Sequence, residues 1–329
     1  MRRISLQNGF ILPGMMMILI FSAATLMAAD QFSLMTKRPV QLSGYTNIRY
    51  QACEDKIDGF DVRRARMSLK GNWDHGVSYK FQGEFGTSKQ KLLDAAVSMN
   101  VRCFTMTAGQ FVLPFSYENV LSSSKLITIN RSQIVEAMAA RSLDVIGNQY
   151  GRDAGFQVSG KFHLIDFGLG VFNGSGINTA DSNESKDLAG RLIFTPIKGL
   201  AIGGSFYHGK YFLSETSRKR NRIGIELNGQ WKVISVAGEY IRGEDAGIEK
   251  DGWYAQAAWG LSKEFQLVLK ADRFDPSTEL TDNALSVYTA GLNVTLNDAF
   301  KIQSNLEIKT EEGVSIDNNA FTTQLQIAF

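Results

Sequence analysis

The chain has 329 residues, with 35 basic and 33 acidic side chains, and 44% of its residues are hydrophobic. This balance excludes the strongly basic surface by which a nucleic-acid-binding protein is recognised. The 31 glycines and 21 phenylalanines, against five prolines, favour a β protein with tight turns over a helical enzyme.

The N-terminus reads as a secretory signal peptide. Arg2 and Arg3 give a positive start, Ile11–Met27 is mostly apolar, and the small residues Ala28 and Ala29 follow. This pattern predicts cleavage near Ala29, so that residues 1–29 form the signal; a membrane anchor is the alternative. Removing them leaves 33 basic and 33 acidic residues. Residues 30–329 are predicted to form one outer-membrane β-barrel domain.

The rest of the chain alternates apolar and polar residues in segments of about ten, the length with which a tilted strand crosses a membrane. The fold class predicted is therefore all-β, a transmembrane antiparallel barrel of about 16 strands; 14 and 18 are the alternatives. The segments are Leu42–Gln51, Asp61–Asn72, Val77–Gly86, Leu92–Val101, Phe104–Phe111, Arg152–Phe162, Leu164–Asn173, Leu188–Pro196, Leu200–His208, Arg222–Trp231, Ile234–Gly243, Gly252–Leu261, Phe265–Phe274, Ser286–Asn297, Phe300–Lys309 and Phe321–Phe329.

Alternation alone does not separate a membrane barrel from a water-soluble sandwich, because both have one apolar and one polar face. The connections favour the barrel, because long and short joins alternate, as extracellular loops and periplasmic turns do. The predicted long joins are Ala52–Phe60, Thr87–Lys91, Val112–Gly151, Gly174–Asp187, Gly209–Asn221, Glu244–Asp251, Asp275–Leu285 and Thr310–Ala320.

The join over residues 112–151 is about 40 residues long, far beyond an ordinary loop, which indicates a functional segment. We expect it to fold into the barrel lumen and narrow the pore. Ser132–Ala140 contains good helix formers after a serine that could cap them, so a short helix is predicted there. Pro114-Phe115 and Val120-Leu121 are expected to anchor the loop by apolar packing.

The two ends of the predicted barrel carry further signals. The chain closes on an alternating strand ending in Phe329, similar to the C-terminal signature of bacterial outer-membrane barrels. Together with the export signal, it predicts the outer membrane of a Gram-negative-type bacterium. Cys53 and Cys103 fall at opposite ends of the barrel, too far apart for a disulfide.

Four blocks of the sequence resemble the phosphate-selective porin O and P family, and together they cover about a third of the chain. The resemblance implies a sixteen-stranded outer-membrane porin, usually trimeric, with the third extracellular loop folded inward. The blocks are FDVRRARMSLKG (Phe60–Gly71), LLDAAVSMNV (Leu92–Val101), GQFVLPFSYENVLSSS (Gly109–Ser124) and INRSQIVEAMAARSLDVIG (Ile129–Gly147).

The densest basic feature contains Arg63, Arg64 and Arg66. Alternation places Arg64, Arg66 and Lys70 on one face of the second strand, where a column of cations would attract an anion. The arginine fork suits phosphate because it can donate two parallel hydrogen bonds. Alternatively, these arginines pair with acids such as Glu84 and fix the inward loop.

Within the loop, Lys125, Arg131 and Arg141 are the cations, and Arg152 follows at the start of the sixth strand. We expect these residues to line the constriction, and Ser122–Ser124 either donates hydrogen bonds to an anion or is a flexible stretch. The remaining lumen-facing charges have both signs, which predicts a water-filled pore. They are Lys80, Asp94, Arg191, Arg222, Glu226, Glu239, Lys270, Asp272, Lys301 and Glu307.

The function predicted is an outer-membrane porin for passive diffusion of small hydrophilic solutes, with a preference for anions or phosphate. The expected partners are these solutes, outer-membrane lipid and two further copies of the chain; no nucleic acid, cofactor or metal is expected. An alternative is a structural or adhesive barrel whose loops bind a surface partner. An esterase would use His208, but no acidic or amide residue stands near it in sequence to orient it. The sequence therefore predicts no enzyme.

Overall fold

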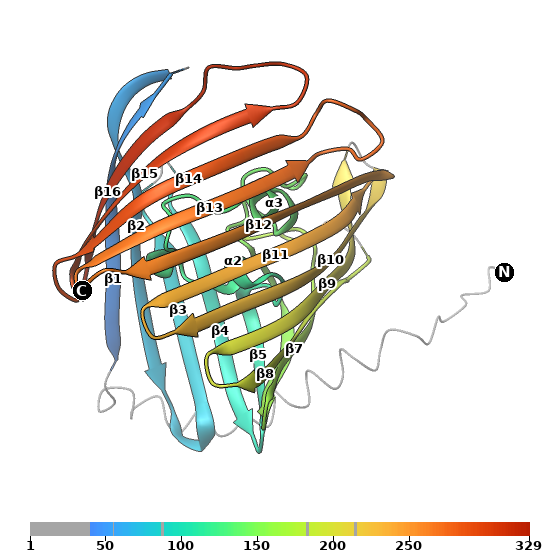
Figure 1. The fold of residues 1–329 in the computed structure, drawn as a ribbon. Helices are drawn as coiled ribbons and strands as arrows, with labels where there is room; N and C mark the ends of the chain where they lie inside the picture. The colour runs from blue at the N-terminus through green and yellow to red at the C-terminus, as the bar shows by residue number, and fades with distance from the viewer. Residues whose placement is uncertain (1–39, 55, 87–88, 182–183, 214–215) are drawn as a thin grey trace.

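The structure is a computed structural model that describes residues 40–329 except 55, 87–88, 182–183 and 214–215. The predicted signal peptide, residues 1–29, lies outside the described residues. Within them, sixteen antiparallel strands form a closed barrel in which each strand pairs with its neighbours in the sequence and β1 pairs with β16 (Figure 1). The predicted fold class is confirmed.

All sixteen predicted segments contain a strand, and the ends differ by a few residues. The short helices are η2 (Asp74–Gly76), α2 (Tyr117–Val120), η3 (Ser123–Lys125) and α3 (Gln133–Met138). The strands are β1 (Gln41–Cys53), β2 (Lys56–Asn72), β3 (Val77–Glu84), β4 (Lys91–Val101), β5 (Phe104–Val112), β6 (Arg152–Phe162), β7 (Ile165–Phe172), β8 (Asp187–Ile197), β9 (Leu200–Leu213), β10 (Thr216–Trp231), β11 (Ile234–Asp245), β12 (Ile248–Gly260), β13 (Phe265–Asp275), β14 (Leu285–Thr295), β15 (Phe300–Glu311) and β16 (Ala320–Ala328).

The barrel is apolar outside and polar inside. On β10, Ile223 and Ile225 are each 64% exposed, whereas Arg222 and Glu226 on the opposite face are 3% and 4% exposed. A water-soluble sandwich would bury the isoleucines and expose the charges. The apolar outer face therefore suits lipid, and a closed barrel leaves no unpaired strand edge there.

The last residue completes the closure of the barrel. Gly44 of β1 and Phe329 exchange two backbone hydrogen bonds, of 2.9 and 3.0 Å. The Phe329 ring lies so close to Gly44 that a Cβ there would come within 2.6 Å of a ring carbon. The terminal phenylalanine therefore packs directly on the first strand.

Three joins that the sequence predicts to be long are short, so the strict alternation of long and short joins is wrong. Two residues separate β1 from β2, β9 from β10, and β11 from β12. Strand pairing continues past the apolar zone, where polar side chains such as Lys210 and Lys219 stand opposite each other. The backbone hydrogen bonds of a hairpin do not require apolar side chains, so loss of the apolar pattern does not mark the strand end.

Cys53 ends β1, and Cys103 lies in the short turn between β4 and β5. The two residues stand at opposite ends of the barrel, as predicted, and the described chain contains no disulfide between them. No described helix is long and apolar enough to cross a membrane.

The pairing of β1 with β2 is interrupted at Arg63. Asn47 stands opposite Arg64, but the next residue, Ile48, stands opposite Val62, so Arg63 is an extra residue in β2. Such a β-bulge redirects side chains locally. Both Arg63 and Arg64 consequently face the lumen, whereas in a regular strand one of them would face the lipid.

Candidate functional site

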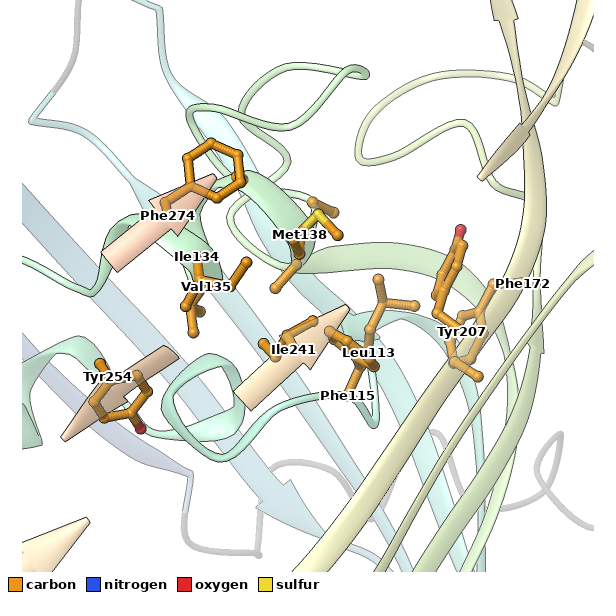
Figure 2. Close-up of a cluster of buried hydrophobic side chains, with 14 of the residues drawn as sticks. Leu113, Phe115, Ile134, Val135, Met138, Phe172, Tyr207, Ile241, Tyr254 and Phe274 are labelled. Atoms are coloured by element: carbon orange, nitrogen blue, oxygen red, sulfur yellow. The ribbon is translucent and has the colours of Figure 1, made fainter. Parts of the chain in front are cut away.

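The join between β5 and β6, residues 113–151 and here called L3, folds into the lumen. Figure 1 shows its helices α2 and α3 enclosed by the strands. Figure 2 shows Leu113, Phe115, Ile134 and Met138 of L3 in one apolar cluster with side chains of the barrel wall, among them Phe172, Ile241 and Phe274. This apolar packing fixes the loop inside the barrel, as the sequence predicts.

The helix predicted over Ser132–Ala140 is shorter, running from Gln133 to Met138, and Ser132 does not cap it with its side chain. The Ser132 hydroxyl instead donates to Glu118 Oε2 at 2.9 Å, and its backbone N–H donates to the same oxygen at 2.8 Å. The serine therefore ties α3 to α2.

A single barrel carboxylate holds the start of α2. Glu239 of β11 accepts hydrogen bonds from the Ser116 hydroxyl at 3.1 Å and from the backbone N–H groups of Tyr117 at 2.9 Å and Glu118 at 2.8 Å. The Tyr254 hydroxyl donates to the same carboxylate at 2.8 Å. This one carboxyl group therefore fixes the first residues of α2 to the barrel wall.

The middle of L3 is held by side chains of β14 and β15. Lys301 Nζ donates to the Ser124 carbonyl at 3.0 Å, and Asn293 Nδ2 donates to the Ile127 carbonyl at 2.9 Å. Asn305 Oδ1 accepts from the backbone N–H of Ile129 at 2.7 Å. These bonds satisfy backbone groups that lie away from bulk water.

The end of L3 is held by a buried ion pair. Arg220 of β10 donates two hydrogen bonds to Asp144, of 3.1 and 2.7 Å, in a fork geometry. Arg222 donates to the Met138 carbonyl at 3.3 Å and to Asp245 at 2.6 Å. L3 therefore has anchors near its start, middle and end.

We expect the Asp144 anchor to survive mild acid. Burial alone would raise the pKa of Asp144, but Arg220 and then Arg222 hold it below its ordinary value, which is about 3.9. A carboxyl whose folded pKa is lowered contributes stability above its unfolded pKa and loses it only as the pH falls through the folded one. The contribution of this anchor to a steady single-channel current should therefore be the same at pH 7 and pH 5.

A variant separates this anchor from other acid effects. Asp144→Asn removes the charge at every pH, so the increase in its current noise over the unchanged protein should be the same at pH 7 and pH 5. A rise at pH 5 in the unchanged protein but not in Asp144→Asn would mean that Asp144 titrates in this range and would contradict the prediction.

Two arginines of β2 face L3 with few competing partners. Arg63 Nη1 donates to the Ile129 carbonyl at 2.8 Å. Among the described residues, neither Arg63 nor Arg64 lies within 4 Å of a carboxylate oxygen, and Arg64 makes no hydrogen bond through its side chain. Glu136 of L3 interacts electrostatically with both. The two guanidiniums are therefore available to a solute.

Glu136 is the acid on the loop side of this passage. It accepts from the Ser142 hydroxyl at 2.5 Å and from the Ser142 backbone N–H at 3.1 Å. Burial would raise its pKa, but Arg141, the Ser142 bonds and Arg131 lower it overall. Cations on the barrel wall therefore face one ionised acid on L3.

The third arginine of β2, Arg66, pairs with Glu84 at 2.7 Å, as the structural alternative in the sequence predicts. Its Nη1 also reaches the Ser123 hydroxyl at 3.3 Å. Arg66 is buried, and it joins the barrel wall to L3. Of the predicted serine run, Ser123 contacts two arginines, because Arg131 donates to it at 3.0 Å.

The guanidiniums of Arg131 and Arg141 interact electrostatically with each other and with Arg66, so these predicted arginines form one cluster. Arg131 donates to the Glu118 and Leu121 carbonyls, and Arg141 donates to Asn119, so both brace L3 from within. Burial lowers the pKa of both guanidiniums.

Arg152 pairs with Asp94 at 2.7 Å. Lys70 and Lys125 are exposed, and neither makes an ion pair within the described ranges.

Sequence reasoning missed Arg63 as a site residue and the anchoring roles of Glu239 and Arg220. The signal available for Arg63 was that two charged residues stand next to each other in an alternating strand. Both side chains can face the lumen only if the strand contains a bulge. Alternation does place Glu239 in the lumen, but no sequence pattern reveals that α2 meets it. No group of three or more potential metal ligands occurs among the residues described.

Comparison with known proteins gives a family match and several similar folds. The family model of the phosphate-selective porin O and P matches residues 42–226. A search of curated proteins gave no match.

Three solved porin-like structures share the fold at low identity. An anion-selective porin from Comamonas acidovorans is 17% identical, with a TM-score of 0.69, covering 89% of this chain and 100% of that one. The trimer form of OmpT from Vibrio cholerae is 9% identical, with a TM-score of 0.64 and coverages of 89% and 99%. OmpF of Salmonella typhi in complex with daunomycin is 7% identical, with a TM-score of 0.64 and coverages of 89% and 98%. At these identities the likeness is one of fold.

Proposed function

We propose that this chain, which belongs to the phosphate-selective porin O and P family, prefers anions and passes inorganic phosphate. As a member of that family it is an outer-membrane porin and not an enzyme. Diffusion is passive, and the solute passes between L3 and the strands that face it. The matched residues, 42–226, include both β2 and L3.

The observation that carries this proposal is the pair Arg63 and Arg64. The β-bulge turns both toward the lumen, and no described carboxylate lies within 4 Å of either. An arginine fork can donate two parallel hydrogen bonds to phosphate, and its charge is permanent at physiological pH. A phosphate passing here would meet donors that an internal ion pair does not already occupy.

The remaining predicted cations act mainly through their charge. Arg66, Arg131, Arg141 and Arg152 have most of their donors engaged in the protein, so they raise the local potential without offering a full binding fork. Lys70 and Lys125 are exposed and add point charges on the barrel wall and on L3. A lumen lined by an excess of one sign concentrates the opposite ion.

We also propose that three copies assemble. The resemblance to the family implies a trimer, and one structurally similar porin, OmpT, is described in a trimer form. In mild detergent, the unheated protein should have three times the mass of the heat-denatured chain. A single-chain mass in every detergent tried would contradict this assembly.

The experiment that tests the anion preference is the single-channel reversal potential in a KCl gradient, before and after adding phosphate. We expect a reversal toward the chloride potential and a concentration-dependent reduction of chloride current by phosphate. A cation preference without block would contradict the proposal and leave a general porin. Absence of any conductance would instead favour the structural or adhesive barrel.

A further inference from the structure

A cavity of about 280 Å³ lies between the start of L3 and the inner face of β6–β8. Ser159 near the end of β6 and Asp166 near the start of β7 line it, so it lies toward the short turn that joins these strands. It is separate from Arg63 and Arg64, which stand on β2. Its volume is near the lower end of pockets that hold small organic molecules, about 300 Å³.

One wall of the cavity is apolar. Val112, Pro114 and Val120 come from the end of β5 and the start of L3, and Ile193 comes from β8. Val120 is 37% exposed, whereas the apolar side chains that dock L3, such as Leu113 and Phe115, are buried. Exposed apolar surface inside a polar lumen is stabilised when an apolar group covers it.

The opposite wall is polar and carries a cation. Arg191 Nε donates to Glu226 at 2.8 Å, and its Nη2 also pairs with Glu226. Its Nη1 has no partner among the described residues. The Gln157 Oε1 atom is buried and likewise lacks a hydrogen-bond partner in the described chain. Asp166 is balanced by Lys161 at 3.3 Å. Of Arg191 Nη1 and Gln157 Oε1, only the guanidinium nitrogen can donate to a carboxylate, because the Gln157 oxygen is an acceptor.

We infer that this cavity is a subsite for small organic anions that carry an apolar body, such as an aromatic carboxylate. The carboxylate would take the free Arg191 donor, and the ring would cover Val112 and Val120. A bare phosphate has nothing to place on the apolar wall, so the two kinds of anion use different parts of the lumen. This inference rests on the proposed anion preference and names a further substrate class for the same channel.

The test is block of single-channel current by benzoate, with acetate at equal concentration as the small-body comparison. Benzoate should reduce the current at concentrations where acetate does not. Val120→Ser should weaken the benzoate block about 3- to 10-fold, as expected for losing the apolar contact of one side chain. Phosphate block should remain unchanged in this variant.

Val145→Ser is the matched control, because it makes the same change at an exposed position of L3 that does not line the cavity. It should leave benzoate block unaltered. The double variant Arg191→Gln with Glu226→Gln removes the cation without leaving an unpaired acid, and it should abolish the difference between benzoate and acetate.

Equal block by benzoate and acetate, or equal effects of Val120→Ser and Val145→Ser, would overturn the inference. Failure here is distinguishable from failure of the proposed function. An anion-preferring channel without benzoate block would remove only the subsite. A channel without anion preference whose benzoate block depends on Val120 would remove only the proposed preference.

Discussion

Reversing the charge of Arg63 and Arg64 together to glutamate is expected to turn the anion preference into a cation preference. Two charges about 4 Å apart interact by about 1 kcal/mol in water and about 4 kcal/mol near a protein surface. A change at both positions should therefore shift the anion-to-cation permeability ratio at least tenfold, by the lower of these estimates. The reversal potential in a KCl gradient should change sign.

The matched control reverses two lysines on the outer surface. Lys210 and Lys219 stand opposite each other on β9 and β10, and both are exposed on the face away from the lumen. Lys210→Glu with Lys219→Glu makes the same net charge change without touching the pore. An equal shift in both double variants would mean that the net charge of the protein, and not the constriction, sets selectivity.

Salt gives a second check on the arginine pair. The Debye length, over which salt screens a charge, falls from about 30 Å at 0.01 M salt to about 3 Å at 1 M. The selectivity difference between the original protein and the Arg63→Glu, Arg64→Glu variant should therefore be larger in dilute than in concentrated KCl. A difference that does not depend on salt would point to a change of pore shape.

The barrel could be predicted from the sequence because its determinants are local. In β10, alternate isoleucines and charges define the two faces, and the strand length follows from the membrane thickness. The prediction failed where the apolar pattern stops before the strand does. The β9–β10 hairpin continues through Lys210 and Lys219 because its backbone hydrogen bonds do not depend on whether these side chains are polar.

The site was less predictable because its determinants lie far apart in the sequence. Arg131 and Arg141 were correctly placed in the inward loop, but whether they face the pore or the loop's own carbonyls depends on how α2 and α3 pack together. Arg63 depends on a single inserted residue that reverses facing in β2. Such details follow from pairing register and tertiary contacts, which alternation does not encode.

Replacing Glu239 by glutamine is expected to loosen the start of L3 and raise single-channel current noise. The carboxylate accepts four hydrogen bonds, three of them from residues 116–118. A glutamine keeps one carbonyl oxygen and turns an amide donor toward the same N–H groups. Because a buried donor left without its acceptor costs about 1–3 kcal/mol, the docking of α2 should weaken by about that amount.

The other anchors of L3 should keep the rest of the loop in place in the Glu239→Gln variant. Asp144 remains bound to Arg220, and Lys301 still holds the Ser124 carbonyl, so L3 should stay in the lumen while α2 fluctuates. Mean conductance should therefore change less than the noise does. Glu249→Gln makes the same substitution on β12, where Glu249 forms an exposed ion pair with Arg242, and should leave the noise unchanged. Equal noise in the two variants would mean that Glu239 does not position the loop.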